Sequence, residues 1–207
     1  MVQTDAPARR TPDRRTEILR RAAAVFREKG FHGAGMREIA AGLGMTPGNL
    51  YYYFRSKEDL LYACQQISLT RLLSSAESIR EQRMPADEAL RALIGAHLDL
   101  TLDELGGSAA HVEFHALPDD LLEEIVGMRD VYEKHIRSLI QRGITEGTFR
   151  PVDVKLTTMA LLGALNWSVV WFKPEGPWSS PDLVAGFADV FVDGLRNPAA
   201  TPKETGA

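Results

Sequence analysis

The segment from Met36 to Tyr53 carries three residues at a spacing that few folds satisfy. Ala40 is followed by Gly44 four residues later, and Leu50 stands six residues beyond that glycine. Two short helices that cross steeply need a small residue where they meet, a residue that accepts a left-handed backbone in the turn, and an apolar anchor in the second helix. The spacing therefore predicts a helix-turn-helix.

The rest of the chain also repeats its apolar residues with the period of an α-helix. No segment alternates strictly between apolar and polar residues, so no strand is expected, and the predicted fold class is all-α. A three-helix N-terminal domain would carry the helix-turn-helix, and a larger helical domain would follow. The expected helices cover residues 11–30, 36–43, 47–54, 57–81, 85–105, 108–117, 118–143, 153–172 and 181–195. The expected domains are a flexible basic tail over 1–12, a helix-turn-helix domain over 13–60, a second domain over 61–197 and a polar tail over 198–207.

The charges are divided unevenly between these two domains. Residues 1–60 hold 11 Lys and Arg against 7 Asp and Glu, whereas residues 61–207 hold 13 against 21. A basic block followed by an acidic remainder indicates that the first part faces a polyanion and the second does not.

Several classes of protein are excluded by what the sequence contains. The single cysteine, Cys64, cannot form an internal disulfide, and no apolar run follows the N-terminal arginines, so a cytoplasmic protein is expected. The uncharged stretch over 156–172 has 17 residues, fewer than the roughly 20 of a membrane span, and it includes polar side chains. Neither a nucleophile elbow nor a glycine-rich phosphate loop occurs, so an enzyme is not expected.

Three runs of residues in the N-terminal part form a recognisable pattern. They are Phe26-x-x-x-Gly30-Phe31, Arg37-x-Ile39-Ala40-x-x-Leu43-Gly44-Met45, and Leu50-Tyr51-x-Tyr53-Phe54-x-Ser56-Lys57-x-x-Leu60. With these runs the chain resembles the TetR (tetracycline-repressor-like) family of bacterial transcriptional regulators, closely over about residues 14–62. One departure is the pair Ala34-Gly35, where the family often has Thr or Ser before the second helix.

The resemblance implies binding to double-stranded operator DNA through the second helix of the motif. Base edges in the major groove would be read from the exposed start of that helix, and Tyr51 and Lys57 would contact phosphates. Tyr53 and Phe54 are interpreted instead as core residues of the small domain. The residues expected at the DNA are Arg14, Arg37, Thr46, Pro47, Gly48, Asn49, Tyr51, Tyr52 and Lys57.

The resemblance also implies that the C-terminal helices bind a small-molecule effector and form a homodimer. The helices over 156–171 and 181–195 are expected at the dimer interface. For each expected ligand-binding residue the alternative is that it simply fills the core, because an aromatic stripe at helical spacing usually does. The expected ligand-binding residues are His97, Phe114, Met128, Tyr132, Leu162, Asn166, Trp167 and Trp171.

Two further features bear on the ligand. The segment from Trp167 to Ser179 resembles the C-terminal signature of a TetR subgroup that includes acyl-CoA-responsive repressors of steroid and fatty-acid catabolism, which implies a repressor released by an acyl-CoA thioester. Arg129 or Arg137 would pair with the CoA phosphates. His111, Glu113 and His115 form a second, weaker hypothesis, a metal site, whose alternative is a set of polar groups at the rim of the pocket. No resident cofactor or metal is therefore predicted.

Overall fold

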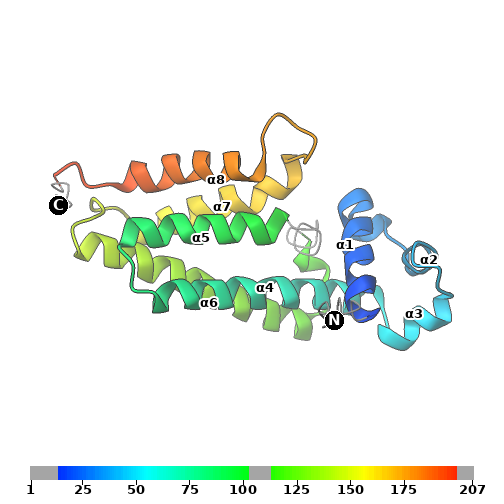
Figure 1. The fold of residues 1–207 in the computed structure, drawn as a ribbon. Helices are drawn as coiled ribbons and strands as arrows, with labels where there is room; N and C mark the ends of the chain where they lie inside the picture. The colour runs from blue at the N-terminus through cyan, green and yellow to red at the C-terminus, as the bar shows by residue number, and fades with distance from the viewer. Residues whose placement is uncertain (1–13, 103–112, 200–207) are drawn as a thin grey trace, which may run out of the picture.

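The computed structural model describes residues 14–102 and 113–199 (Figure 1). These residues form α-helices and no strand, which confirms the predicted all-α fold. The helices are α1 (Arg14–Gly33), α2 (Met36–Ala41), α3 (Pro47–Tyr53), α4 (Lys57–Glu81), α5 (Ala86–Leu102), α6 (Asp119–Thr145), α7 (Val154–Trp171) and α8 (Ser180–Ala188). A 3-10 turn, η2 (Phe114–Ala116), precedes α6, and a π-helical turn, η3 (Asp189–Asp193), extends α8.

The predicted helix-turn-helix is present as α2 and α3. Ala40 and Leu50 are fully buried, and Gly44 has the positive φ of 63° that the turn requires. The backbone amide of Met45 donates to the carbonyl of Ala40 over 2.9 Å and closes the turn. The second helix of the chain ends at Ala41 rather than at the predicted position 43, because the turn begins two residues earlier.

Helix α1 is interrupted at Gly30, where the sequence predicts its end. The backbone there takes φ 69° and ψ 167°, and one more turn follows to Gly33. A left-handed φ of this kind is costly for any residue with a Cβ atom, which explains the glycine. The interruption leaves the amide of Phe31 available for a partner outside the helix. The predicted start of this helix over 11–13 lies outside the described residues.

The long helix α4 belongs to both parts of the molecule. Its first turn starts at Ser56, whose side chain accepts a hydrogen bond from the amide of Asp59 over 3.1 Å. Its N-terminal end packs against α1, and its remaining turns pack against α5 and α6 (Figure 1). The predicted domain boundary at residue 60 thus lies inside α4, so that the N-terminal helices are held at one end of the bundle.

The helices of the C-terminal bundle follow the predicted bounds, with two differences. A helix is predicted over 108–117, but residues 108–112 lie outside the described residues. In the described part of this range the structure has only the 3-10 turn η2. The last helix is α-helical only to Ala188 and continues as η3. Asp153 and Ser179 directly precede α7 and α8, and their side chains cap these helices by accepting hydrogen bonds from the amides of Leu156 and Asp182.

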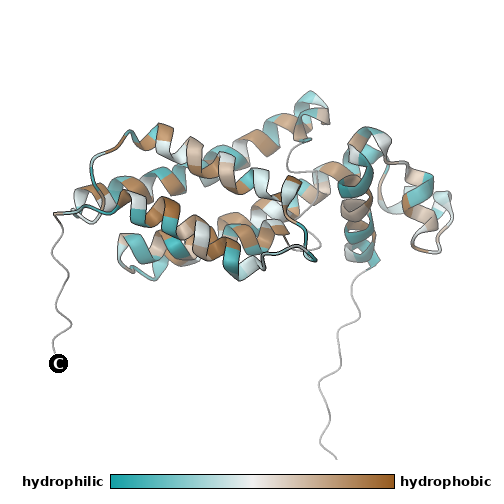
Figure 2. Ribbon diagram, turned by 90° about the horizontal axis from the view of Figure 1, so that it is seen from above, coloured by the Kyte–Doolittle hydropathy of each residue, from teal (hydrophilic) through white to brown (hydrophobic). Residues whose placement is uncertain are grey.

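Hydrophobic residues gather along the elongated bundle, and some lie on its outside (Figure 2). The outward side of α7 carries apolar residues three, four or eight positions apart, which places them on one face of the helix. In the described part of the chain, none of the helices combines the length and the apolar character that a bilayer span requires. The exposed apolar residues of this α7 stripe are Leu156, Met159, Trp167, Val170 and Trp171.

Candidate functional site

The start of α3 projects from the N-terminal helices. Thr46 caps the helix by accepting a hydrogen bond from the amide of Asn49 over 3.2 Å, and Pro47 occupies the first helical position. The four residues 46–49 are all exposed, and the side chains of Tyr51 and Tyr52 are 49% and 86% exposed. This exposed surface can therefore enter a groove of a bound macromolecule. The buried side chain of Leu50 anchors α3 to the core on its opposite side.

A hollow of about 410 Å³ lies beside α3 and brings together residues that the sequence predicts at the DNA. Arg14, Asn49 and Tyr52 line it, together with Gly44 of the turn. The guanidinium of Arg14 donates to the carbonyl of Leu43 over 3.0 Å and pairs with Glu17 over 2.6 Å. Arg14 thus links the start of α1 to the turn of the motif.

The two remaining predicted cations lie on either side of this surface. Arg37 is exposed on α2. The ammonium group of Lys57 donates to the carbonyl of Phe31 over 2.7 Å and lies 4.2 Å from the centre of the Phe31 ring. Tyr53 is half-buried and Phe54 is buried, as expected for core residues.

Four of the predicted ligand-binding residues meet around a cavity in the C-terminal bundle. His97, Tyr132, Leu162 and Asn166 line it with Arg129, and its volume is about 40 Å³. Nδ1 of His97 and the hydroxyl oxygen of Tyr132 lie 3.1 Å apart. Nε2 of His97 is buried without a well-formed hydrogen bond, although the side chain of Asn166 approaches it. A buried nitrogen left in this state is a polar group available to a ligand.

Burial sets the charge states of the cavity. It lowers the pKa of His97 to about 4, a shift that the Asn166 side chain partly opposes, so this imidazole is neutral near pH 7. Burial likewise raises the pKa of Tyr132 and lowers the pKa of Arg129. A guanidinium stays charged in proteins, so Arg129 brings a positive charge to a largely apolar region.

The other four predicted ligand-binding residues do not line this cavity. The ring of Phe114 lies under the guanidinium of Arg129, 4.1 Å from it, and Met128 packs against the core. Trp167 and Trp171 are on the exposed stripe of α7, where they are 56% and 40% exposed. The assignment of these two tryptophans to the ligand site stays a prediction.

A carboxylate connects the bundle to the N-terminal helices. Glu113, directly before η2, accepts a hydrogen bond from the amide of Phe31, which the break at Gly30 leaves free. A Cβ atom at residue 30 would stand 3.1 Å from a carboxylate oxygen of Glu113, so the glycine also makes room for it. Sequence reasoning placed Glu113 in a metal hypothesis and did not find this contact.

The metal hypothesis finds no support among the described residues. No group of three potential metal ligands occurs within 14–102 and 113–199. His111 lies outside these ranges, and His115 stacks against Phe114 with ring centres 4.0 Å apart.

Two protein-family models match this chain, one for each of its parts. A family model described as bacterial regulatory proteins, tetR family, matches residues 18–64. A second model, described as the tetracyclin repressor-like C-terminal domain, matches residues 83–195, which is more than half of the chain. The chain belongs to the TetR family. The resemblance inferred from the helix-turn-helix is thereby confirmed, as is the expectation of a transcriptional regulator rather than an enzyme.

Three relatives illustrate where the chain lies within the TetR family. The HTH-type transcriptional repressor KstR2 of Mycobacterium tuberculosis is 28% identical, over 92% of this chain and 97% of the relative. The TetR regulator PfmR of Thermus thermophilus has a solved structure with 31% identity and a TM-score of 0.76, over 89% of this chain and 100% of that chain. AibR, solved in complex with isovaleryl coenzyme A and operator DNA, has 26% identity and a TM-score of 0.77, over 90% and 100%.

Proposed function

We propose that this TetR-family regulator is a homodimeric repressor that leaves its operator when a small molecule, in the first place an acyl-CoA thioester, binds the C-terminal bundle. The observation that carries the proposal is the exposed start of α3, held by a capped and anchored helix-turn-helix. The relative named as a repressor covers nearly the whole chain, which supports the sign of regulation.

The geometry supports different roles for the residues proposed at the DNA. Thr46, Gly48 and Asn49 would face base edges in the major groove, and Tyr52 would extend this surface. Tyr51 and Lys57 would contact phosphates, which position the helix without reading sequence. Pro47 fixes the first turn of α3, and Arg14 and Arg37 would supply charge at the edges of this surface.

A dimer is supported by the apolar stripe of α7. Five large apolar residues exposed along one helix form a surface that a monomer rarely leaves in water. A groove of about 340 Å³ continues it between Trp171 and α8, where Leu183 and Phe187 lie. Two copies joined there would present two α3 helices, which must be spaced by about 34–36 Å to enter successive major grooves.

An acyl-CoA effector is supported by the AibR relative and by the partly buried charge of Arg129. A positive charge among apolar residues favours a ligand that carries both an acyl chain and an anionic or strongly polar group. The cavity of about 40 Å³ is much smaller than the roughly 300–1,000 Å³ of a typical ligand pocket. The effector would therefore have to displace side chains of α5, α6 and α7, and this displacement would be the signal.

The structure offers a route by which that signal could reach the DNA-binding helices. Arg129 lines the cavity and stacks on Phe114, and the neighbouring Glu113 holds the amide of Phe31. The carbonyl of Phe31 in turn holds Lys57, four residues after the end of α3. A ligand that moves Arg129 would thus disturb a chain of contacts ending beside the recognition helix.

A matched pair of variants tests the DNA-binding part of the proposal. Tyr51→Phe removes an exposed hydroxyl at α3, whereas Tyr62→Phe removes a hydroxyl on α4 that bonds Glu124 over 2.5 Å. With an operator selected from a random duplex pool, we expect fluorescence anisotropy to show about tenfold weaker binding for Tyr51→Phe, since a hydrogen bond to a charged phosphate is lost. Tyr62→Phe should bind as the unaltered protein does, and equal affinities of all three would contradict the proposed contact.

The effector class is tested by thermal unfolding with acyl-CoA thioesters, their free acids and CoA alone. A ligand at 100 times its dissociation constant adds about 2.7 kcal/mol to stability. We expect a rise in melting temperature with one class of thioester and none with CoA. The same thioester should release the operator, and the absence of both effects across the panel would remove acyl-CoA as the effector class.

A further inference from the structure

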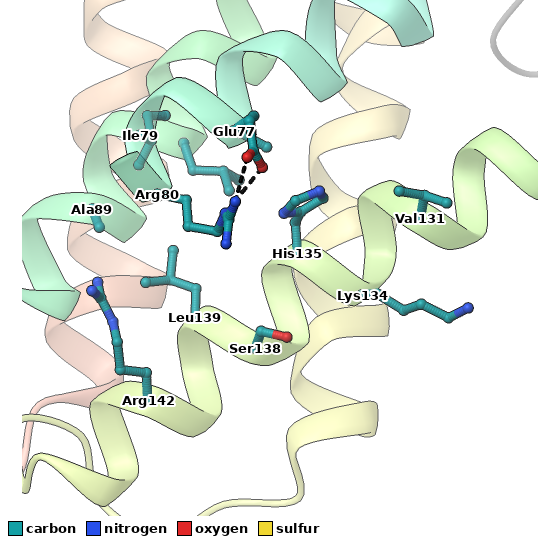
Figure 3. A pocket seen from close by; sticks show the side chains of 12 residues that line it. Glu77, Ile79, Arg80, Ala89, Val131, Lys134, His135, Ser138, Leu139 and Arg142 are labelled. Carbon is teal, nitrogen blue, oxygen red and sulfur yellow. Dashed lines mark hydrogen bonds and ion pairs between the residues drawn. The ribbon is translucent and has the colours of Figure 1, made fainter. Parts of the chain in front are cut away.

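A second cavity lies at the end of the bundle that is remote from the helix-turn-helix. It is lined by the last turns of α4, the first turns of α5 and the second half of α6 (Figure 3). Its volume is about 490 Å³. None of the residues that line it also lines the small cavity around His97. Its size lies within the usual range of small-molecule pockets, roughly 300–1,000 Å³.

The floor of this remote cavity is apolar. Ile79 of α4 and Leu93 of α5 are buried beneath it, and Leu139 of α6 packs against the same core. Ala76 and Ala89 add small side chains, which leave the space open. Such a floor favours an aliphatic chain, because the removal of apolar surface from water stabilises the bound state.

The rim carries more cations than carboxylates. Arg80, Lys134 and Arg142 line the cavity against one carboxylate, that of Glu77, and His135 adds an imidazole. Figure 3 shows Arg80 of α4 and His135 of α6 facing each other across the opening, whereas the side chain of Lys134 points away. Arg142 donates to the carbonyl of Met84 over 3.1 Å at the other end and closes the cavity there.

Arg80 is already held in place for an anion. Its guanidinium bonds both carboxylate oxygens of Glu77, one of them over 3.0 Å and the other more closely. A guanidinium has five N–H donors in a planar fork, so donors remain after a single bidentate pair. His135 stands opposite them with an imidazole that can donate one more hydrogen bond.

We propose that this remote cavity binds an aliphatic carboxylate, with the carboxylate between Arg80 and His135 and the chain along Ile79, Leu93 and Leu139. A thioester has no carboxylate for Arg80 and His135 to bind, so the free acid is the ligand rather than the thioester. The inference does not depend on the identity of the effector or on its site, and it gives the regulator a second, separate small-molecule site.

Isothermal titration calorimetry with the full-length protein tests this assignment, with sodium decanoate below its micelle concentration as the probe. We expect decanoate to bind, and decanol to bind at least tenfold more weakly. Decanoyl-CoA could also occupy the effector site around His97, so it is compared through Arg80→Ala, which should weaken the binding of decanoate and leave that of decanoyl-CoA unchanged. Equal binding of decanol would show that the rim does not recognise the carboxylate, and weakening of decanoyl-CoA by Arg80→Ala as large as that of decanoate would overturn the choice of a free acid. Absence of decanoate binding would overturn the site itself.

Variants at the rim locate the bound acid. Arg80 is an exposed side chain, so Arg80→Ala should fold normally, and it should weaken decanoate binding about tenfold, as should His135→Ala. Lys134→Ala removes a charge of the same sign that points away from the opening, and we expect less than a twofold change. Methyl NMR shifts should appear at Ile79, Leu93 and Leu139; shifts confined to Leu72 and Leu162 would place the acid in the small cavity and contradict the proposal.

Discussion

The carboxylate of Glu113 accepts a hydrogen bond from the backbone amide of Phe31, a residue 82 positions earlier in the sequence. The contact depends on the interruption of α1 at Gly30, since an unbroken helix would use this amide within its own ladder. It joins the loop before α6 to the helix that packs against α2. This hydrogen bond adds to the packing of α4 against α1, which also holds the DNA-binding helices on the bundle.

Replacement of Glu113 by Ala should loosen this junction. The buried amide would lose its partner, and we expect a loss of about 1–3 kcal/mol in the free energy of unfolding. Urea unfolding measures the loss, and hydrogen exchange should show faster exchange of the Phe31 amide. Glu123→Ala, which removes an exposed carboxylate of α6, is the control and should change neither. If Phe31 exchanged at the same rate in both variants, the carboxylate would not be the partner of this amide.

Substitutions at two glycines with open surroundings distinguish the effect of backbone strain on stability from that of packing. No atom lies within 4 Å of a Cβ built on Gly44 or on Gly127, but Gly44 has φ +63° and Gly127 lies within α6. We expect Gly44→Ala to lower the free energy of unfolding by about 1–2 kcal/mol, because alanine is strained at this φ. Gly127→Ala should raise it by up to about 1 kcal/mol, since alanine favours the helix. Urea unfolding distinguishes the two, and a change of the same sign in both would contradict this assignment.

The helix-turn-helix could be predicted from sequence because its determinants are local. Ala40, Gly44 and Leu50 lie close together in the sequence. Ala40 and Leu50 are buried and Gly44 has a positive φ, as predicted. The cavity around His97 and Asn166 could be predicted in part, since a polar residue in an apolar helix must find partners.

The remaining features depend on contacts that no local pattern contains. Apolar residues at helical spacing do not reveal whether they face their own core, a ligand or a second molecule, so the exposure of Trp167 could not be predicted from the sequence. Glu113 binds a backbone amide, and an amide has no sequence signature. The remote cavity is lined by Ala76 of α4 and Ala89 of α5. The small size of these side chains leaves a cavity only because the two helices pack together, and the sequence does not show that packing.

The buried imidazole of His97 should make stability depend on pH. Its folded pKa of about 4 lies below the value of about 6.5 expected in the unfolded chain, so the unfolded chain binds the extra proton first. The contribution is fully present above about pH 6.5 and declines toward pH 4, by up to about 1.4 kcal/mol per pH unit. Urea unfolding at pH 7.5 and 5.0 measures this decline, and His97→Gln should reduce the difference between the two pH values. His115→Gln, at an exposed position, should leave it unchanged, and equal differences in both variants would argue against His97 as the titrating group.

The apolar stripe of α7 can be tested with two valines. Val170 lies on the stripe and is 52% exposed, and Val126 lies on α6 and is 38% exposed. A charge at the centre of an interface loses its water without gaining a partner, so we expect Val170→Asp to weaken dimerisation at least a hundredfold, about 2.7 kcal/mol. Sedimentation velocity should then show monomers at micromolar concentration, with DNA affinity reduced because one protomer reads only one half-site. Val126→Asp introduces the same charge outside the stripe and should remain dimeric. A dimeric Val170→Asp variant with unchanged operator affinity would exclude this face as the interface.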